Sequence, residues 1–356
     1  MGRITLAQAA QWCGGRIDPK YADVAFFGAN NDTRKLERGQ LFLALQGVRD
    51  GHDFIPTALE KGAAAVLCTH CDGDYPAIVV PDVRMALGDI ARQERKRIGM
   101  KVVAVTGSVG KSTTKEMIAC ALQSTYKVGK TPVNHNNDIG MPMAILGMRE
   151  DTQVAVLEMG MNHFREIAYL SSIASPDIAV IVNIGTMHIE HLGSREGILQ
   201  AKMEILEGMR EDGKVILNGD DDMLWGQKGN IPVKTVYFGI DNDECSVRGS
   251  DISEEDRLLR FQVINANLTY PVELAMEGRH YVSDALAAVA VGMELGVNPS
   301  KVQENLSRFQ NMAGRQEIFE ARGCTVIKDC YNAGPESMAA ALTVLGKRQG
   351  RRIAVL

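Results

Sequence analysis

The fold is decided by residues 102–114, which read Val102-Val103-Ala104-Val105-Thr106-Gly107-Ser108-Val109-Gly110-Lys111-Ser112-Thr113-Thr114. The apolar start predicts a buried strand, the two glycines predict a turn, and the residues from Lys111 predict a helix. A phosphate-binding loop requires this context, because glycines let backbone N–H groups close around phosphate oxygens and the helix N-terminus adds positive potential. Lys111 would reach the terminal phosphates and the Ser112 hydroxyl would bind Mg²⁺.

The loop departs from the usual pattern G-x-x-x-x-G-K-[ST], because Val105 stands where the first glycine is expected. A chance G-x-x-G-K-S in a turn is the alternative. The strand before the loop and the helix after it favour phosphate binding. We therefore assign nucleotide binding to Gly107, Ser108, Val109, Gly110, Lys111, Ser112 and Thr113.

The residues around this loop predict an α/β fold. Short apolar runs at 154–157, 178–184 and 215–217 are separated by helical patterns, which favours a mostly parallel sheet covered by helices on both faces. Residues 234–275 alternate between apolar and polar and predict antiparallel strands, and 280–295 predict a helix with an Ala-rich apolar face.

Three domains are expected from these patterns. Residues 1–82 predict a small α/β domain, and 83–312 predict the central parallel-sheet domain with the phosphate loop. A helix over 83–98 ends in the charged run 92–97, which we expect to be a solvated face leading to the boundary. Residues 313–356 predict the beginning of a third, Rossmann-like α/β domain with strands at 324–328 and 352–356, and we expect the sequence to stop inside it.

Composition narrows the class of protein. The chain has 356 residues, 45% hydrophobic and 23% charged, enough for more than one core. The net charge of -5 is spread over mixed runs, so we expect no nucleic-acid partner. No run resembles a membrane helix or a signal core, so we expect a cytoplasmic protein without membrane insertion. Seven scattered cysteines favour reduced thiols, with metal or redox chemistry at Cys68 and Cys71 as the alternative.

The phosphate loop resembles that of the Mur ligases, which share this shortened form with folylpolyglutamate synthetases. Four further segments, in order and spacing, extend the resemblance over essentially the whole chain. They are Asn136-Asn137-Asp138-Ile139-Gly140-Met141-Pro142, Glu158-Met159-Gly160-Met161-Asn162-His163, Asn183-Ile184-Gly185-Thr186-Met187-His188-Ile189-Glu190-His191-Leu192-Gly193-Ser194 and Ala201-Lys202-Met203-Glu204-Ile205.

Within the family, the chain is similar to the members that add D-alanyl-D-alanine to a UDP-muramoyl tripeptide. The Glu-Met-Gly-x-Asn form at 158–162 distinguishes them from the members that add diaminopimelate or lysine. The N-terminal segments 32–34 and 42–47 resemble the family's module for the UDP-sugar end of the substrate, which implies substrate binding by Thr33, Arg34 and Gly47. A folylpolyglutamate-type ligase is the alternative enzyme, and the module at 32–34 argues against it.

The resemblance also implies a catalytic set of Lys111, Glu158, His188 and Lys202. Ser112, Glu158, His188 and Lys202 would bind metal ions, with Lys202 as the lysine that the family carbamylates. The alternatives are a structural histidine for His188 and a helix-surface salt bridge for Lys202. Asn136 and Asn137 would orient phosphate or the acceptor site, although a hydrogen-bonded turn explains them almost as well.

For the base and ribose of ATP, the resemblance implies Asp284, Arg315 and Asp329. The family has asparagine where this chain has Tyr281, Asp284 and Gly334, and an aspartate cannot donate as an amide does. An interdomain ion pair is the alternative for Arg315.

The implied reaction is an ATP- and Mg²⁺-dependent ligation through an acyl phosphate, by a monomer. Its partners would be UDP-N-acetylmuramoyl-tripeptide and D-alanyl-D-alanine. Because the third domain only begins in this sequence, we expect the 1–356 chain to be deficient in turnover. The corresponding alternative function is binding of the substrates without turnover.

Overall fold

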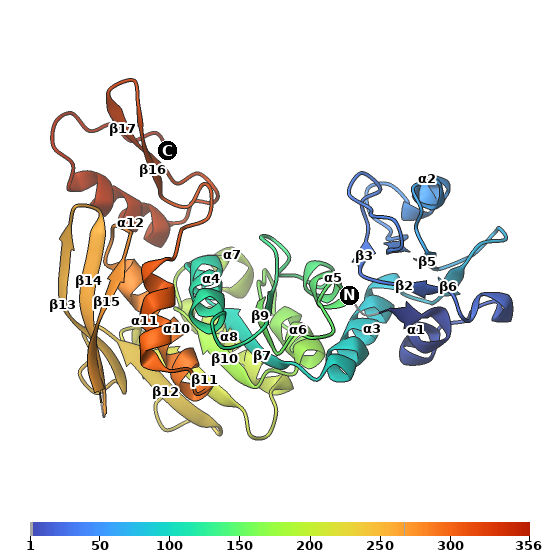
Figure 1. Cartoon of the computed structure of the whole chain (residues 1–356), viewed down its shortest axis with the longest axis horizontal. Coiled ribbons are helices and arrows are strands. Elements are labelled where there is room, and N and C mark those ends of the chain that lie inside the picture. The colour runs from blue at the N-terminus through green and yellow to red at the C-terminus, as the bar shows by residue number, and fades with distance from the viewer. Residues whose placement is uncertain (1–2, 267) are drawn as a thin grey trace.

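The computed structural model describes residues 3–266 and 268–356. Figure 1 shows an elongated molecule, with the N-terminal α/β unit at one end, a large sheet in the middle and the C-terminal segment above the far end of that sheet. The mixed α/β class predicted from the sequence is confirmed. Among the described residues, no helix is long and apolar enough to cross a membrane.

The N-terminal unit is built on a parallel four-stranded sheet in the order β3-β4-β5-β6. Every residue of its two central strands is buried, as expected for a parallel sheet. The strands are β3 (Ala29–Asn30), β4 (Leu41–Leu43), β5 (Ala65–Cys68) and β6 (Ala77–Val79), and an antiparallel pair is formed by β1 (Ile4–Thr5) and β2 (Ala25–Phe26). The helical segments are α1 (Leu6–Cys13), η1 (Pro19–Tyr21), η2 (Gly51–Phe54) and α2 (Ile55–Glu60).

Helix α3 (Val83–Ile98) joins this unit to the central sheet. It begins where the Asp82 side chain accepts hydrogen bonds from Arg84 N and Met85 N, and it packs against α1 on one side and α5 and α6 on the other. The prediction that 92–97 is a solvated face is wrong in part, because Arg95 is buried and donates to Ser175 O at 2.6 Å. The charge at this helix end therefore anchors the helix to the central part.

The central sheet has nine strands in the order β15-β14-β13-β12-β11-β10-β7-β9-β8. The run from β8 to β13 is parallel, and β13, β14 and β15 are antiparallel. The strands are β7 (Lys101–Thr106), β8 (Val128–Lys130), β9 (Val154–Glu158), β10 (Ile178–Ile181), β11 (Lys214–Asn218), β12 (Lys234–Gly239), β13 (Val247–Glu255), β14 (Leu258–Asn265) and β15 (Leu268–Leu274).

Strand β7 shows how the two faces are covered. Val102 and Ala104 belong to the core shared with α3, α5 and α6, and Val103 and Val105 belong to the core shared with α4 and α10. This alternation follows from the period of two along a strand. The helices are α4 (Lys111–Leu122), α5 (Gly140–Leu146), α6 (Glu166–Ala174), α7 (Ile189–Leu192), α8 (Arg195–Met203), η3 (Glu204–Gly208), α9 (Asp222–Trp225), α10 (His280–Glu294) and α11 (Pro299–Ser307).

Strand order positions the site. The chain runs from β7 to β8 and back to β9 on one side, and then crosses to β10 on the other side of β7. In open parallel sheets, ligands bind outside the carboxyl ends of the strands at the point where the order reverses. Here that point is the carboxyl end of β7.

Two local predictions are corrected. Strand β12 lies in the region predicted to be antiparallel, but it pairs in parallel with β11. Its last four residues are all buried, as in a strand covered on both faces. Residues 352–356 were predicted to form a strand, but they are exposed and form none, because no described strand lies beside them to supply the ladder hydrogen bonds.

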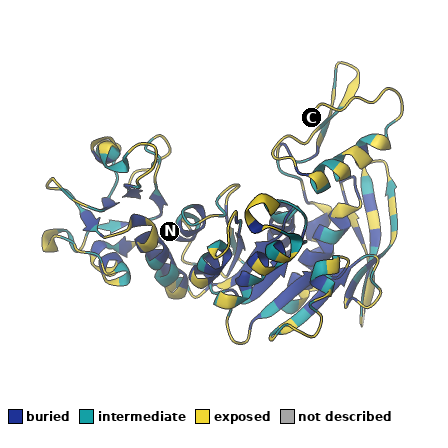
Figure 2. Cartoon of the chain, turned by 180° about the vertical axis from the view of Figure 1, so that it is seen from behind, coloured by how far each residue is buried: buried dark blue, intermediate teal, exposed yellow. Residues whose placement is uncertain are grey.

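The C-terminal segment consists of an antiparallel pair and one helix. The elements are β16 (Glu317–Ala321), β17 (Cys324–Lys328) and α12 (Pro335–Gly346). Figure 2 shows this segment mostly exposed, in contrast to the buried central sheet. Helix α12 is held at its carboxyl end, where Lys347 donates to Glu254 at 2.8 Å and Arg348 donates to Glu277 at 2.5 Å.

Candidate active site

The phosphate loop leaves the carboxyl end of β7 and enters α4 at Lys111. Its backbone is held by Asn183, whose Oδ1 accepts hydrogen bonds from Ser108 N at 3.0 Å and Val109 N at 2.9 Å. Lys111 Nζ donates to Gly107 O at 2.8 Å and to Ser108 O at 3.1 Å. The lysine amine therefore lies against the loop whose amides would surround a phosphate.

Gly110 gives the loop its turn into α4. Its φ is 84°, a conformation that favours glycine, and a Cβ there would lie 3.2 Å from Asp284 Oδ1. Burial lowers the pKa of Lys111, and the nearby Glu158 carboxylate opposes that shift. A charged lysine here would thus be stabilised by an anion brought by a ligand.

Glu158 ends β9, the strand beside β7. It is 3% exposed, and its Oε1 accepts a hydrogen bond from Asn136 Nδ2 at 2.9 Å. Its Oε2 is buried and has no hydrogen-bond partner among the described residues. A buried carboxylate oxygen without a donor is unfavourable, so the site is suited to a cation.

Asn137 is next in sequence to Asn136, the hydrogen-bond partner of Glu158, but its own side chain bonds to nearby backbone. Its Oδ1 accepts hydrogen bonds from Gly140 N at 2.7 Å and Ile139 N at 3.3 Å, at the start of α5. The structure therefore contains the hydrogen-bonded turn that was the alternative for this residue, while Asn136 supports Glu158.

His188 and Lys202 approach the phosphate loop from the other side of β7. His188 follows β10 and precedes α7 with a φ of 66°. Burial lowers its pKa first, and the charge of Lys111 lowers it further. The imidazole is therefore neutral near neutral pH, which is the form that binds metal ions.

Lys202 is buried in α8, with 2% of its surface exposed. Within the described part of the chain, its amine has neither a hydrogen bond nor an ion pair, so the alternative of a surface salt bridge is wrong. Burial lowers its pKa well below the ordinary value, and Lys111 adds to the shift. The uncharged amine that this favours is a nucleophile.

All of these groups line one cavity of about 680 Å³. Its wall includes the predicted residues Ser108, Val109, Gly110, Lys111, Ser112, Thr113, Asn136, Asn137, Glu158, His188, Lys202 and Arg315. The sequence reasoning gave no role to several other residues of this wall, among them Arg84, Asn162, Arg165 and Tyr169. Asn162 and Asn183 belong to the motif segments 158–163 and 183–194, so the sequence did mark their neighbourhood. Arg84 and Tyr169 lie in no such motif.

The residues of this cavity fit a divalent ion that arrives with phosphates. Among the described residues, no group of three or more His, Cys, Asp or Glu side chains is arranged to hold a metal. Mg²⁺ commonly takes only one or two protein ligands and completes its shell with phosphate oxygens and water. The unpartnered Oε2 of Glu158 and the Ser112 hydroxyl supply ligands of that kind.

A second cavity, of about 310 Å³, shares Val109, Gly110, Thr113 and Arg315 with the first. It is lined by Asp284 and Asp329, so the structure brings the three residues expected at the base and ribose together. Asp284 Oδ1 accepts a hydrogen bond from Thr114 Oγ1 at 2.6 Å, and burial raises its pKa to about 7.

Arg315 forms no ion pair among the described residues, contrary to the alternative proposed for it. Its guanidinium carbon lies 3.9 Å from the centre of the Tyr331 ring instead. This stacking leaves its N–H groups available at the junction of the two cavities.

The N-terminal residues form a separate site. Thr33 and Arg34 line a cavity of about 540 Å³ together with Arg49 and Phe54, to which the sequence reasoning gave no binding role. Two nitrogens of the Arg34 guanidinium each lie 2.9 Å from an Asp32 oxygen. Gly47 lies in the adjoining turn, where its N–H donates to Arg49 O at 3.2 Å.

Comparison with known proteins places this geometry in a family. Residues 105–292 match the Mur ligase middle domain, and residues 28–95 match the catalytic domain of the Mur ligase family. The chain is 39% identical to the UDP-N-acetylmuramoyl-tripeptide–D-alanyl-D-alanine ligase of Bacillus subtilis, and the alignment covers 98% of this chain and 77% of that protein.

Two solved structures share the fold. The crystal structure of MurF from Acinetobacter baumannii superposes with a TM-score of 0.92 at 33% identity, covering 99% of this chain and 78% of that one. MurF ligase from Thermotoga maritima in complex with ADP gives a TM-score of 0.82 at 29% identity, covering 91% and 76%. This chain belongs to the Mur ligase family.

Proposed function

We propose that the chain ligates D-alanyl-D-alanine to UDP-N-acetylmuramoyl-tripeptide at the expense of ATP. One observation carries this proposal: the phosphate loop, Glu158, His188 and the buried Lys202 line the same cavity. In that cavity, Glu158 has a buried carboxylate oxygen without a hydrogen-bond partner among the described residues, which suits a cation. The names of the relatives, such as the Bacillus subtilis ligase, support the choice of substrates.

The first step would be phosphoryl transfer. The carboxylate of the tripeptide attacks the γ-phosphorus of ATP, the bond to the bridging oxygen breaks, and an acyl phosphate and ADP form. Lys111 and the loop amides would stabilise the charge on the transferred group. Mg²⁺ held by Ser112 and Glu158 would neutralise phosphate charge when bound.

The second step would form the amide. The amine of D-alanyl-D-alanine attacks the acyl carbon, inorganic phosphate leaves, and the amine proton passes to a base. Arg315 lies where both cavities meet and would hold phosphate oxygens in place. Holding the two reactants together in one cavity would supply much of the acceleration.

Lys202 would act as a carbamate. Its uncharged amine would add to CO₂ with loss of one proton, so that a new N–C bond replaces an N–H bond and the side chain becomes an anion. With His188, that anion would provide ligands for a second divalent ion. The burial of the amine and its lack of a partner support this role.

The remaining assignments concern the substrate and the setting. The cavity with Thr33 and Arg34 would receive the uridine diphosphate end of the substrate, and Asp284, Arg315 and Asp329 would receive the nucleoside of ATP. We expect a cytoplasmic protein, because its substrates ATP and the UDP-linked peptide are made in the cytoplasm, and we expect it to be a monomer.

The proposal is tested by product analysis with competing acceptors. The chain is incubated with MgATP, UDP-muramoyl tripeptide and either D-alanyl-D-alanine or L-glutamate, and products are identified by mass spectrometry. We expect the pentapeptide product, even if it forms slowly, from D-alanyl-D-alanine alone. It should be lost in Lys111→Ala and kept in Lys101→Ala, the exposed lysine at the other end of β7. Ligation of glutamate instead would refute the proposed acceptor.

A further inference from the structure

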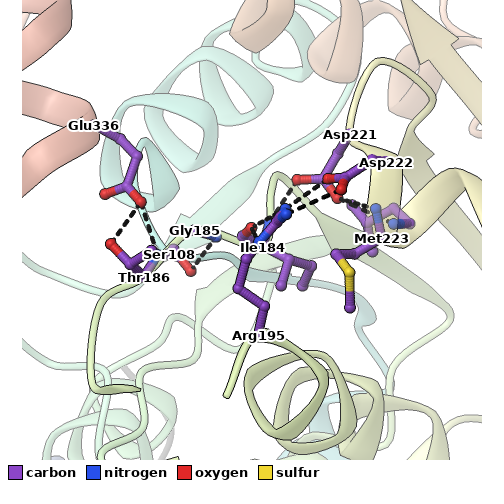
Figure 3. Close-up of polar contacts among 10 residues, drawn as sticks. Ser108, Ile184, Gly185, Thr186, Arg195, Asp221, Asp222, Met223 and Glu336 are labelled. Carbon is purple, nitrogen blue, oxygen red and sulfur yellow. Dashed lines mark hydrogen bonds and ion pairs between the residues drawn. The ribbon is translucent and has the colours of Figure 1, made fainter. Parts of the chain in front are cut away.

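The N-terminal end of α12 makes a contact that the reaction described above does not use. Glu336 Oε1 accepts two hydrogen bonds from Thr186, one from the backbone N–H at 2.7 Å and one from Oγ1 at 2.8 Å. The two residues are 150 positions apart in the chain. Figure 3 shows the Glu336 carboxylate above Thr186, next to Gly185 and Ser108.

Thr186 belongs to a turn that holds the phosphate loop. The neighbouring Gly185 N donates to Ser108 Oγ at 2.9 Å, and Asn183 fixes the N–H groups of Ser108 and Val109. Two positions further along the chain is His188. Glu336 is thus connected through one short turn to the phosphate loop and to His188, which line the catalytic cavity.

The same turn is fixed on its other side by groups from the central part alone. Ile184 N donates to Asp221 Oδ2 at 2.7 Å, and Arg195 Nη2 donates to Ile184 O at 3.0 Å and to Asp222 Oδ1 at 2.6 Å (Figure 3). The first half of the turn is therefore held whatever α12 does. The second half of the turn leads to His188. It is held from the C-terminal segment by the hydrogen bonds between Thr186 and Glu336.

The carboxylate is charged and strongly held. Burial would raise the pKa of Glu336, but hydrogen bonds from its own backbone and from Thr186 lower it overall. Its Oε2 is buried without a partner in the described part of the chain. A carboxylate that is ionised and partly desolvated makes strong hydrogen bonds to backbone N–H groups, so this contact fixes the turn more firmly than a neutral one would.

We propose that Glu336, which also lines the cavity assigned to the nucleoside, is a positioning residue that couples the docking of α12 to the arrangement of the phosphate loop and of His188 through Thr186. This inference rests on the proposed ATP site. When α12 is docked, the turn at 184–188 is held at both ends. When it is not, the loop amides and His188 lose one of their two supports, and nucleotide binding weakens.

The test compares variants at the two ends of α12 in the full 356-residue chain. Glu336→Ala removes the contact with the turn, whereas Lys347→Ala removes an ion pair at the other end of the same helix, with Glu254. Glu336→Gln keeps an oxygen that can accept both hydrogen bonds from Thr186. Amide hydrogen exchange is measured without nucleotide, and MgATP affinity is measured by calorimetry.

We expect Glu336→Ala to speed exchange at Ser108, Val109, Gly185 and Thr186 and to weaken MgATP binding about tenfold, as expected for hydrogen bonds to a charged group. Glu336→Gln keeps the acceptor but loses the charge, so it should recover part of this loss. Lys347→Ala should leave exchange in the turn unchanged, because the Arg348–Glu277 ion pair still holds that end of α12. Thr186→Val should reproduce part of the effect and add little to Glu336→Ala.

Unchanged exchange in the turn, or equal losses in Glu336→Ala and Lys347→Ala, would overturn the coupling. Failure of Glu336→Gln to recover affinity would overturn it as well. If the unmodified chain does not bind MgATP, the proposed function fails, but the exchange arm still reports on the coupling, so the two failures remain distinguishable.

Discussion

A lysine amine that is almost fully buried needs a counter-charge or loses its proton, because desolvation disfavours the ion. Lys202 has no such counter-charge among the described residues. Lys115 is equally buried, but it donates to Thr131 O at 2.7 Å and lies 3.0 Å from Glu116. Both lysines are therefore buried, but within the described part of the chain only Lys115 has a hydrogen-bond acceptor and a carboxylate beside its amine.

This difference gives a prediction about CO₂. In isotope-labelled bicarbonate, Lys202 should form a carbamate and Lys115 should not, which carbon NMR of the labelled chain can resolve. Lys202→Ala should lower ligation about a hundredfold, the scale of a lost metal-site contact, and short carboxylates should restore part of it. Labelling of both lysines, or of neither, would contradict the assigned role.

Asp284 gives a prediction about stability and pH. Burial raises its pKa from 3.8 to about 7, so between these values the folded state keeps a proton that the unfolded state has released. Stability therefore falls as pH rises through this window, by up to about 4 kcal/mol. Asp284→Asn keeps the acceptor for Thr114 and removes the penalty.

We expect Asp284→Asn to have a higher free energy of unfolding than the parent near pH 8, and the gap to close toward about pH 4. Denaturant titrations at the two pH values measure it. Asp23→Asn, at an exposed position, is the control and should change little at either pH. A gap that is the same at both pH values would show that burial of this carboxyl does not carry the effect.

At the scale of elements, the sequence was most informative where local signals agreed. Helix α3 has the predicted limits, because Asp82 caps its start and Gly99 ends it with a φ of 72°. β12 was assigned wrongly, because an apolar run with period two fits either strand direction and the neighbour that decides it, β11, is a tertiary contact. Residues 352–356 show the same limitation, since strand formation depends on a partner.

The entry into α4 can be tested with matched glycines. Gly110 and Gly99 both have positive φ, but a Cβ at Gly99 meets nothing within 4 Å, whereas a Cβ at Gly110 lies 3.2 Å from Asp284. Alanine should lower the free energy of unfolding by about 1–2 kcal/mol at either site. Only Gly110→Ala should also weaken MgATP binding, about tenfold or more, because it displaces the loop amides.

Denaturant unfolding and calorimetry on the two variants check this prediction. If Gly99→Ala weakens MgATP binding as much as Gly110→Ala does, the effect is general destabilisation and the loop has no special role.

At the scale of the whole molecule, the motifs predicted which residues meet but not what surrounds them. Lys111, Glu158, His188 and Lys202 lie in one cavity although they span 92 positions of the chain. They meet because Glu158 ends β9, and because Lys111 and His188 lie in the segments after β7 and β10, at the same edge of the sheet. Arg84 and Tyr169 also line this cavity, but they belong to helices α3 and α6. No local sequence pattern indicates that these helices contribute to the cavity wall.

The separation of the two cavities also determines how the substrate must lie on the chain. The sites assigned to the uridine diphosphate end and to ATP lie in different parts of the molecule, so the substrate would have to extend from one to the other. The chain spans about three quarters of the length of the relatives it matches.

The central claim is that the chain uses ATP to ligate D-alanyl-D-alanine to the tripeptide, so phosphate should be released from ATP only as part of amide formation. The most direct measurement is phosphate release by the full chain with MgATP, UDP-muramoyl tripeptide and D-alanyl-D-alanine, and with each of the three omitted in turn. We expect release, even if slow, to require all three and to disappear in Lys111→Ala. Release that continues without D-alanyl-D-alanine, or binding of all three substrates with no release, would contradict the account.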